Sequence, residues 1–546
     1  MLLPISYNFI TKGKTFFKTT KETYTLIKIL RSLLIMLDDT QRLALDTITI
    51  GKQALIFVPS RASAEKTAEE IAALTTLQCS ELAEFMENVT SPPTKQCRRL
   101  AKCVRKGVAF HHAGLLQEQR ERIEDEFRKG TLKIICATPT LAAGLSLPVY
   151  RVVIKSLKRF SGQWGMDWIP VLEYLQMAGR AGRPEYEKIG EALSIAKDNG
   201  EKEEIYEKYI CGVPEDIYSK LAVEPVLRTY LLSLIASGII TSEQTMRDFF
   251  ARTFWAYQFE DMARLEVILV RMQSLLQEWQ FITVTGGESH TSGFVSASTL
   301  TTEKRLRATL LGKRVAELYL DPLTAKRFCD CFFAVSKKTL SPFSLLHMIS
   351  DTLEMRPLLR IKAKEEERMQ GEVFQRIESI LHPEPTPFDP DYDDFLCSIK
   401  TALFFEEWVA ERDEDYLLET YNIAPGEVRV KQDNADWLLY AAEELAKLLQ
   451  FDTLVREIVR IRARIQYGIK EELLPLIRLK GIGRVRARKL FAHGLKDIGD
   501  LKNADVTTLS QLLGKTVAQE VKKQLGQEIE EISVGKRKGQ MSILKF

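Results

Sequence analysis

The feature that most limits the fold of this chain is an alternation of short apolar runs with polar, helix-forming stretches between residues 52 and 154. Apolar runs that end in turn residues are typical of buried strands. Strands that alternate with helices predict a parallel sheet whose functional loops lie at the strand ends. We expect strands within residues 52–61 and 108–114 and at residues 132–137 and 151–154, with helices at residues 63–74 and 117–128.

A second constraint comes from residues 176–184, where Arg180 and Arg183 each follow a glycine. A helix start at this point would place both guanidinium groups on one side. Arginine is permanently charged, and its planar fork matches phosphate oxygens. Small neighbours also allow a large polyanion to approach. Taken alone, the segment fits a solvated basic turn equally well, but the strands upstream favour phosphate binding.

Four segments resemble motifs of the second RecA-like domain of superfamily 2 helicases, in the Ski-like branch and most similar to the archaeal HelQ-type DNA helicases. They follow the order of that family over about 130 residues: 57–61 (Phe-Val-Pro-Ser-Arg), 111–115 (His-His-Ala-Gly-Leu), 137–144 (Ala-Thr-Pro-Thr-Leu-Ala-Ala-Gly) and 176–184 (Gln-Met-Ala-Gly-Arg-Ala-Gly-Arg-Pro). The family usually has Asn where Ser146 stands, so we expect the contact made there to be weakened or rearranged.

The resemblance implies an ATP site. It implies that Arg180 and Arg183 contact the ATP phosphates as arginine fingers, with Gln176 in the same motif. Fingers of this kind stabilise the charge that develops during phosphoryl transfer, which accelerates it on the order of 10³-fold or more. Thr138 and Gly144 would couple the nucleotide to the nucleic-acid backbone. The glycines assigned to nucleotide binding are Gly144, Gly179 and Gly182.

The other half of such an ATP site is not recognisable in the sequence. Lys12-Gly13-Lys14-Thr15 lacks the glycine that a P-loop needs five residues before Gly13, where Asn8 stands. No acidic box that would hold Mg²⁺ is evident either. We therefore expect ATP and Mg²⁺ to be shared with a P-loop RecA-like domain on a separate chain, or this half of the site to be lost.

We expect a multidomain chain in which an α/β RecA-like helicase C-terminal domain is followed by a winged helix, an α-helical ratchet domain and a helix-hairpin-helix domain. Two predicted helices, 226–237 and 265–279, and a weak strand pair, 281–284 with 293–295, suggest the winged helix. The predicted boundaries are 1–40 (unassigned), 41–200 (RecA-like), 201–295 (winged helix), 296–455 (helical ratchet), 456–520 (helix-hairpin-helix) and 521–546 (basic tail).

Two aromatic segments are candidates for contact with DNA bases. Residues 155–168 interleave basic and aromatic side chains, and a hairpin there would place Phe160 and Trp164 where they stack on bases. The strand-separating hairpin of the family falls in this interval; a surface loop packed back on the sheet is the alternative. Trp437 matches the family's base-stacking tryptophan on a long ratchet helix, with core packing as its alternative. The family's partner arginine falls at Val430, between Arg429 and Lys431.

Residues 479–490 carry a helix-hairpin-helix signature. Gly481 and Gly483 form a turn that opens a helix, whose backbone amides and dipole suit a DNA phosphate. Such a motif contacts the backbone and not the base sequence, so its affinity should fall steeply with salt. A solvated basic face is the alternative. The arginines around the turn are Arg484, Arg486 and Arg488.

The C-terminal residues Gln540, Ile543 and Phe546 resemble a peptide that binds a sliding clamp. One turn of 3₁₀ helix would place Ile543 and Phe546 on one face. A chance match in a disordered tail explains the same residues equally well.

Composition narrows the class of protein. A net charge of +3 means that a nucleic-acid surface must be a local patch. Eight cysteines without a Cys-x-x-Cys pair are expected to be reduced thiols, and the six histidines show no metal-ligand spacing. With neither a secretory signal nor a membrane-crossing run evident, we expect a cytoplasmic protein.

The sequence therefore predicts the C-terminal body of an ATP-dependent 3′-to-5′ DNA helicase that acts on stalled or branched replication forks in DNA repair. Single-stranded and forked DNA would be its partners. A non-catalytic DNA-binding scaffold is the alternative from a different class, and RNA remodelling by a Ski-like helicase is a further one.

Overall fold

The computed structural model describes residues 37–90, 92–142, 147, 149–160, 165–182, 189–285, 304–335 and 337–527. The chain separates into two compact units, and each is treated by itself. The first contains Met1–Ile217 together with Leu418–Val430, and the second contains Tyr218–Leu417 together with Lys431–Phe546.

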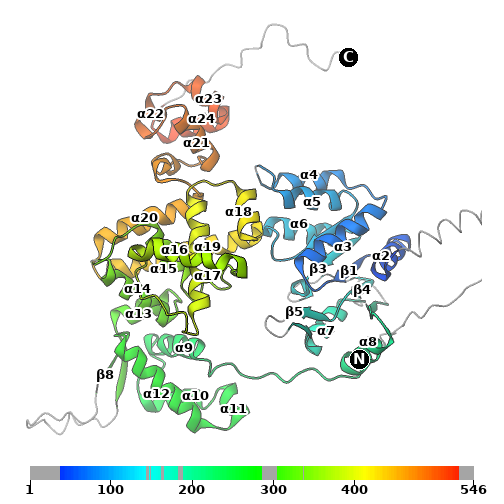
Figure 1. Cartoon of the computed structure of the whole chain (residues 1–546), viewed down its shortest axis with the longest axis horizontal. Helices are drawn as coiled ribbons and strands as arrows, with labels where there is room; N and C mark the ends of the chain where they lie inside the picture. The colour runs from blue at the N-terminus through cyan, green and yellow to red at the C-terminus, as the bar shows by residue number, and fades with distance from the viewer. Residues whose placement is uncertain are drawn as a thin grey trace, which may run out of the picture. The chain divides into compact units, whose positions relative to one another are not determined.

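The first unit is built on a five-stranded sheet with the strand order β2-β3-β1-β4-β7 (Figure 1). Every neighbouring pair in this sheet is parallel, which confirms the predicted parallel sheet. Every residue of the first four strands is buried, as expected for a sheet covered on both faces. The strands are β1 (Ala54–Phe57), β2 (Val108–His111), β3 (Ile134–Ala137), β4 (Arg151–Ile154) and β7 (Glu191–Ser194).

Helices cover this sheet, and the two that the sequence predicts are present as α3 (Arg61–Leu74) and α6 (Gln117–Arg128). The sequence analysis predicted no helix between residues 75 and 107, where the structure has two. Both bury small and apolar side chains in the core shared with the sheet. The remaining helices of this part are α2 (Asp39–Thr49), α4 (Ser80–Asn88), α5 (Lys95–Val104), α7 (Val171–Ala178) and α8 (Asn199–Ile205).

A separate two-stranded hairpin precedes α7. Strand β5 (Lys158–Phe160) pairs antiparallel with β6 (Met166–Trp168), so the predicted hairpin is present. Trp164 lies outside the described residues.

The second unit begins with helices and one antiparallel strand pair. The helices predicted at residues 226–237 and 265–279 are found as α9 (Glu224–Ala236) and α12 (Met262–Glu278). Strand β8 (Ile282–Thr285) pairs along its whole length with β9 (Arg305–Ala308), a segment that we expected to be helical. The expected partner at 293–295 falls outside the described residues. Two shorter helices, α10 (Glu243–Phe250) and α11 (Phe254–Phe259), lie between α9 and α12.

The helical region, predicted at residues 296–455, begins after β9 and continues in the structure to residue 467. The proline-rich segment 383–390 interrupts it with a turn in which the Thr386 N–H and hydroxyl both donate to the Asp389 carboxylate. Its helices are α13 (Leu310–Glu317), α14 (Pro322–Ala334), α15 (Pro342–Ser350), α16 (Glu366–Arg376), α17 (Tyr392–Val409), α18 (Glu414–Tyr421), α19 (Pro425–Leu448) and α20 (Asp452–Tyr467).

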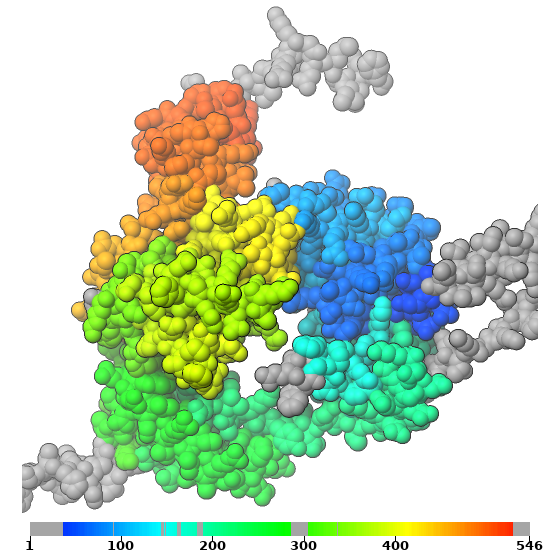
Figure 2. Space-filling view, in the orientation of Figure 1, coloured from blue at the N-terminus to red at the C-terminus, as the bar shows by residue number. Residues whose placement is uncertain are grey.

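Four short helices complete the described chain. They form a closely packed lobe with its own apolar core, which draws on residues 469–521 (orange to red in Figure 2). These helices are α21 (Arg484–Ala492), α22 (Ile498–Asn503), α23 (Val506–Leu513) and α24 (Lys515–Gln524).

A buried ion pair joins α9 to the start of α14 within the second unit. The Arg228 guanidinium donates two hydrogen bonds to the Asp321 carboxylate, at 2.7 and 2.9 Å, and both side chains are at most 10% exposed. Asp321 also accepts from the Leu323 backbone N–H and so caps α14. Because both charges are paired and hydrogen-bonded, removing one partner would leave the other buried without compensation.

We predict that Arg228→Met lowers the free energy of unfolding of the second unit by about 3–5 kcal/mol, the range for breaking a buried pair. A urea titration followed by circular dichroism measures it. Arg271→Met removes the exposed pair with Glu224 and serves as the control, with an expected change of at most about 1 kcal/mol. Equal effects of the two substitutions would contradict the role assigned to Arg228.

Candidate functional site

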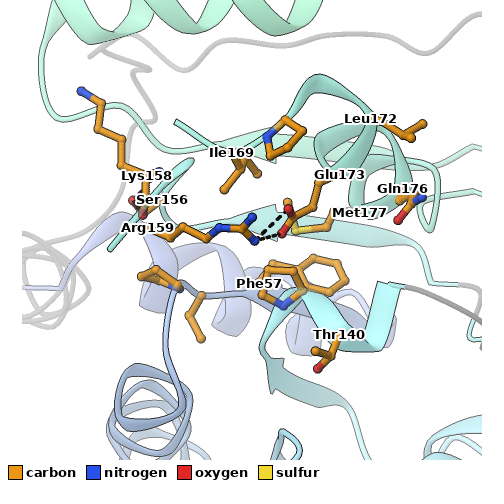
Figure 3. A pocket seen from close by; sticks show the side chains of 14 residues that line it. Phe57, Thr140, Ser156, Lys158, Arg159, Ile169, Leu172, Glu173, Gln176 and Met177 are labelled. Carbon is orange, nitrogen blue, oxygen red and sulfur yellow. Dashed lines mark hydrogen bonds and ion pairs between the residues drawn. The ribbon is translucent and has the colours of Figure 1, made fainter. Parts of the chain in front are cut away.

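The carboxyl ends of three strands meet at one edge of the parallel sheet. Phe57 of β1 pairs in register with Ala137 of β3 and with Ile154 of β4, so the residues that follow these strands emerge together. A cavity of about 420 Å³ lies there. It is lined by Phe57, Val58, Pro59, Pro139, Thr140, Ser156, Lys158, Arg159, Ile169, Pro170, Leu172, Glu173, Gln176 and Met177 (Figure 3). Three of the four sequence motifs contribute to this lining.

Helix α7 brings the arginine-rich motif to this edge. Gln176 lines the cavity, and Gly179 ends the helix. The Arg180 guanidinium donates a hydrogen bond to the Ala142 carbonyl, in the short helix that follows Thr138. The structure therefore brings Gln176 and Arg180 together with the Thr138 motif.

Gly182 occupies a position that only glycine fits well. Its φ is +64°, and a Cβ there would lie 2.5 Å from the Gly190 backbone N. Its own N–H donates to the Val149 carbonyl at 2.9 Å. This close approach fixes the chain where it leaves the arginine motif. Arg183 and Gly144 lie outside the described residues.

Thr138 follows β3 directly and is partly exposed. Its hydroxyl lies 2.9 Å from that of Thr140, which lines the cavity. Two hydroxyl groups at a strand end are available to accept or donate hydrogen bonds to a polar backbone.

The β5–β6 hairpin presents an apolar pair to solvent. Phe160 stands opposite Met166 in the ladder, and the two are 67% and 59% exposed. The sequence analysis named Phe160 but missed Met166. Met166 can be identified only from the strand register, since it lies six residues after Phe160 in a segment without apolar periodicity. An exposed apolar pair at a hairpin is suited to stacking against bases.

The base of this hairpin is held by charged groups. The Arg159 guanidinium donates to both carboxylate oxygens of Glu173 on α7, each at 2.9 Å. Figure 3 shows the two side chains extended toward each other within the cavity. On the neighbouring residue, the Lys158 ammonium lies 4.0 Å from the centre of the Trp168 ring. The hairpin is thus tied to the helix that ends at the arginine motif.

Helix α19 carries the tryptophan that the sequence singled out. Trp437 is half-buried, and its indole N–H donates to the Leu318 carbonyl at 3.1 Å. Arg429 is exposed, whereas Lys431 is 7% exposed and its ammonium donates to the Pro357 carbonyl at 2.8 Å. The Lys431 side chain therefore points into the helical region. Successive residues on a helix point about 100° apart, so Arg429, two positions earlier, points in a different direction.

The Gly481–Gly483 turn has the geometry that the sequence predicts. Gly481 has φ of +84°, Ile482 is buried, and Gly483 is the N-cap of α21. The Arg486 guanidinium is exposed and donates to the Gly481 carbonyl at 2.7 Å. Backbone N–H groups at the start of α21 therefore stand next to an exposed positive charge, as an anion site needs.

The two other arginines of α21 have partners within the second unit. Arg488 forms ion pairs with Glu411 and with Glu472. Arg484 donates to the Arg412 carbonyl at 2.6 Å and lies over the Trp408 ring, and burial lowers the pKa of its guanidinium. Sequence spacing alone did not show that these two charges face the end of α17.

The structure also describes the cysteines, together with the residues searched for metal groups and for membrane helices. All eight cysteines lie in the described part of the chain and are free thiols. Within the same residues, His, Cys, Asp and Glu form no group that would hold a metal ion, and no helix is long and apolar enough to cross a membrane. The clamp-like residues Gln540, Ile543 and Phe546 lie outside the described range.

Comparison with known families matches three parts of the chain. Residues 36–185 match the family described as helicase conserved C-terminal domain. Residues 343–468 match archaeal helicase, domain 4, and residues 473–527 match the SAM-like helix-hairpin-helix tandem.

Several curated proteins are similar to nearly the whole chain. They include proteins named ATP-dependent DNA helicase Hel308 from Pyrococcus horikoshii (37% identity, 90% of this chain and 66% of that protein) and Pyrococcus abyssi (37%, 91% and 67%). A third, from Methanocella arvoryzae, is 36% identical over 90% of this chain and 65% of its own length. The chain thus spans about two thirds of the length of the relatives it matches.

We predict that Glu173→Gln loosens the hairpin, because the neutral amide cannot balance the Arg159 charge. Arg159 is 48% exposed, so the pair contributes at most about 1 kcal/mol, and amide exchange of residues 158–168 should rise about twofold to fivefold. Hydrogen–deuterium exchange by mass spectrometry measures this. Glu203→Gln, at an exposed carboxylate of α8, is the control. Unchanged exchange in Glu173→Gln would show that the Arg159–Glu173 pair does not hold the hairpin.

Proposed function

The chain belongs to the Hel308 family of ATP-dependent DNA helicases, and we propose that it is the DNA-binding body of such a helicase. It would unwind stalled or branched replication forks with 3′-to-5′ polarity in DNA repair, acting in the cytoplasm. This proposal rests mainly on the position of α7 between the hairpin and the arginine motif. One helix holds the base of an exposed apolar hairpin through Glu173 and leads into Arg180 of the arginine motif.

The nucleotide would bind beside the end of α7. Arg180 and Arg183 would act on the ATP phosphates, with Gln176 beside them and with Gly144, Gly179 and Gly182 allowing close approach. These groups fit the phosphate half of a nucleotide site, because they supply positive charge and small neighbours. Carboxylates for Mg²⁺ and a phosphate-cradling loop would come from a P-loop RecA-like domain on a separate chain.

The DNA would contact both units. In the first unit, Thr138 would bind backbone, and Phe160 and Trp164, joined by Met166, would separate strands. In the second unit, Trp437 would stack on a base, in a helical domain of the ratchet type. Arg429, earlier on the same helix and grouped with the first unit, would also contact DNA. Segment 224–308, with helices α9 to α12 and the β8–β9 pair, would form a winged helix that braces the motor.

The helix-hairpin-helix lobe would bind DNA backbone through the Gly481–Gly483 turn and Arg486. Arg484 and Arg488 would support this surface indirectly, since both have protein partners. Lys431 is too buried to contact DNA without rearrangement. A sliding clamp would bind the C-terminal residues Gln540, Ile543 and Phe546.

The catalytic half of the proposal is tested by joining the chain to the P-loop segment of a Hel308 relative and measuring ATP hydrolysis with single-stranded DNA. We expect DNA-stimulated hydrolysis and a kcat lowered on the order of 10³-fold or more by Arg180→Ala. Arg271→Ala, on α12, should retain the full rate. Full hydrolysis by Arg180→Ala would remove this residue from the site. DNA binding without any hydrolysis would favour a non-catalytic scaffold.

The lobe's role is tested by the salt dependence of DNA binding. Because Arg486 would neutralise one phosphate, Arg486→Ala should reduce the slope of log affinity against log salt by about 1, equally for unrelated sequences. Fluorescence anisotropy at several salt concentrations measures the slope. An unchanged slope would exclude a phosphate contact by Arg486. Tighter binding of single-stranded RNA than of DNA would favour RNA remodelling.

A further inference from the structure

The turn after β2, residues 112–115, holds the first turn of α19. Both belong to the first unit, since Leu418–Val430 groups with the RecA-like domain. The Gly426 N–H of α19 donates to the Gly114 carbonyl at 2.9 Å. The motif His111–Leu115 thus has a contact that its resemblance to helicase motifs did not assign.

Two glycines make this contact possible. A Cβ on Gly426 would lie 2.3 Å from the Leu115 carbonyl oxygen and 2.6 Å from that of Ala113. A Cβ on Gly114 would lie 2.8 Å from the Ala424 Cβ. Gly426 has an ordinary helical backbone, so the requirement for glycine there is steric and not conformational. Any larger residue must push the helix away from the turn.

Hydrogen bonds around His112 hold the turn 112–115 in place. The Gly114 N–H donates to His112 Nδ1 at 3.1 Å, which leaves Nε2 to donate to Glu65 at 3.2 Å. Gln96 and Arg99 also donate to Glu65. Burial alone would raise the pKa of Glu65, but these donors and the Arg99 charge lower it, so the carboxylate stays ionised.

Charged groups flank the glycine contact. Arg61 at the start of α3 pairs with Glu427 of α19, whose carboxylate also accepts from the Ala424 N–H at 3.0 Å. Lys95 at the start of α5 pairs with Glu419 of α18. Besides the glycine contact, one ion pair therefore binds the first turn of α19 and another binds α18, the helix before it.

Helix α19 continues without interruption for 24 residues, about 36 Å at 1.5 Å per residue. From Lys431 onward it belongs to the second unit, where Asn434 donates to the Glu354 carbonyl and Trp437 to that of Leu318. One helix therefore begins in the RecA-like domain and carries the proposed base-stacking tryptophan.

We propose that residues 112–115 form a socket for the first turn of α19, and that Gly114, Gly426 and the Arg61–Glu427 pair are positioning residues that fix where the helix carrying Trp437 begins. This inference rests on the proposed function only for the role of Trp437. The socket makes the RecA-like domain and α19 bind one strand as a linked pair, so affinity for a strand long enough to reach both exceeds that for a shorter one.

The socket is tested without DNA by Gly426→Ala in the full chain. We expect amide exchange of residues 112–116 and 424–430 to rise at least tenfold, because the Cβ displaces the helix. Gly371→Ala is the matched control, since Gly371 lies within α16 and a Cβ there meets nothing within 4 Å. Equal exchange in the two variants would overturn the socket, whether or not the chain binds DNA.

The positioning role is tested with two single-stranded DNA oligonucleotides, one of about 5 and one of about 20 nucleotides. Gly426→Ala should weaken binding of the long strand at least tenfold and change binding of the short strand less than twofold, because only the linkage is lost. An equal loss for both strands would overturn the positioning role and indicate general damage. If the unaltered chain binds neither strand, the proposed function fails while the exchange result stands.

A charge exchange provides a test that does not enlarge a glycine. Arg61→Glu and Glu427→Arg should each raise exchange of residues 424–430 about threefold or more, and the double variant should restore protection. A double variant as exposed as either single variant would show that this pair does not position α19.

Discussion

The in-register parallel pairing of β1, β3 and β4 is the constraint on which the functional geometry depends. Because Phe57, Ala137 and Ile154 share one level of the ladder, the loops that follow these strands reach one edge together. The cavity, the hairpin and the arginine motif are all attached to that edge. A parallel sheet is buried on both faces, so its loops are the part free to bind ligands. The chemistry of the first unit therefore follows from its strand register.

Helix α7 and the first turn of α19 both contact loops at this edge of the sheet. Helix α7 ties the base of the hairpin to Arg180, and the Gly426 N–H in the first turn of α19 donates to the Gly114 carbonyl in the turn after β2. Each is a continuous helix, which resists bending because its backbone hydrogen bonds are internal. The hairpin and the arginine motif are thus joined through one helix of the first unit.

Much of the fold followed from local patterns, and the rest depended on packing. The apolar runs predicted β1 to β4, and glycine spacing predicted the Gly481–Gly483 turn. The pairing of β8 with β9 was missed because the residues between them carry no pattern that sets a register. The directions of Lys431, Arg484 and Arg488 were also missed, because spacing locates a charge on a helix and not the element that packs against it. Met166 became a candidate only through its partner Phe160.

The most direct test of the central claim is photocrosslinking of the chain to forked DNA that carries 5-iododeoxyuridine at the junction and along the single strand. Mass spectrometry then identifies the crosslinked residues. The account predicts crosslinks to Phe160 in the hairpin from the junction and to Trp437 in α19 from the single strand, because both aromatic rings would stack on bases. Crosslinks confined to residues 473–527 would contradict it, since DNA would then bind only the helix-hairpin-helix lobe.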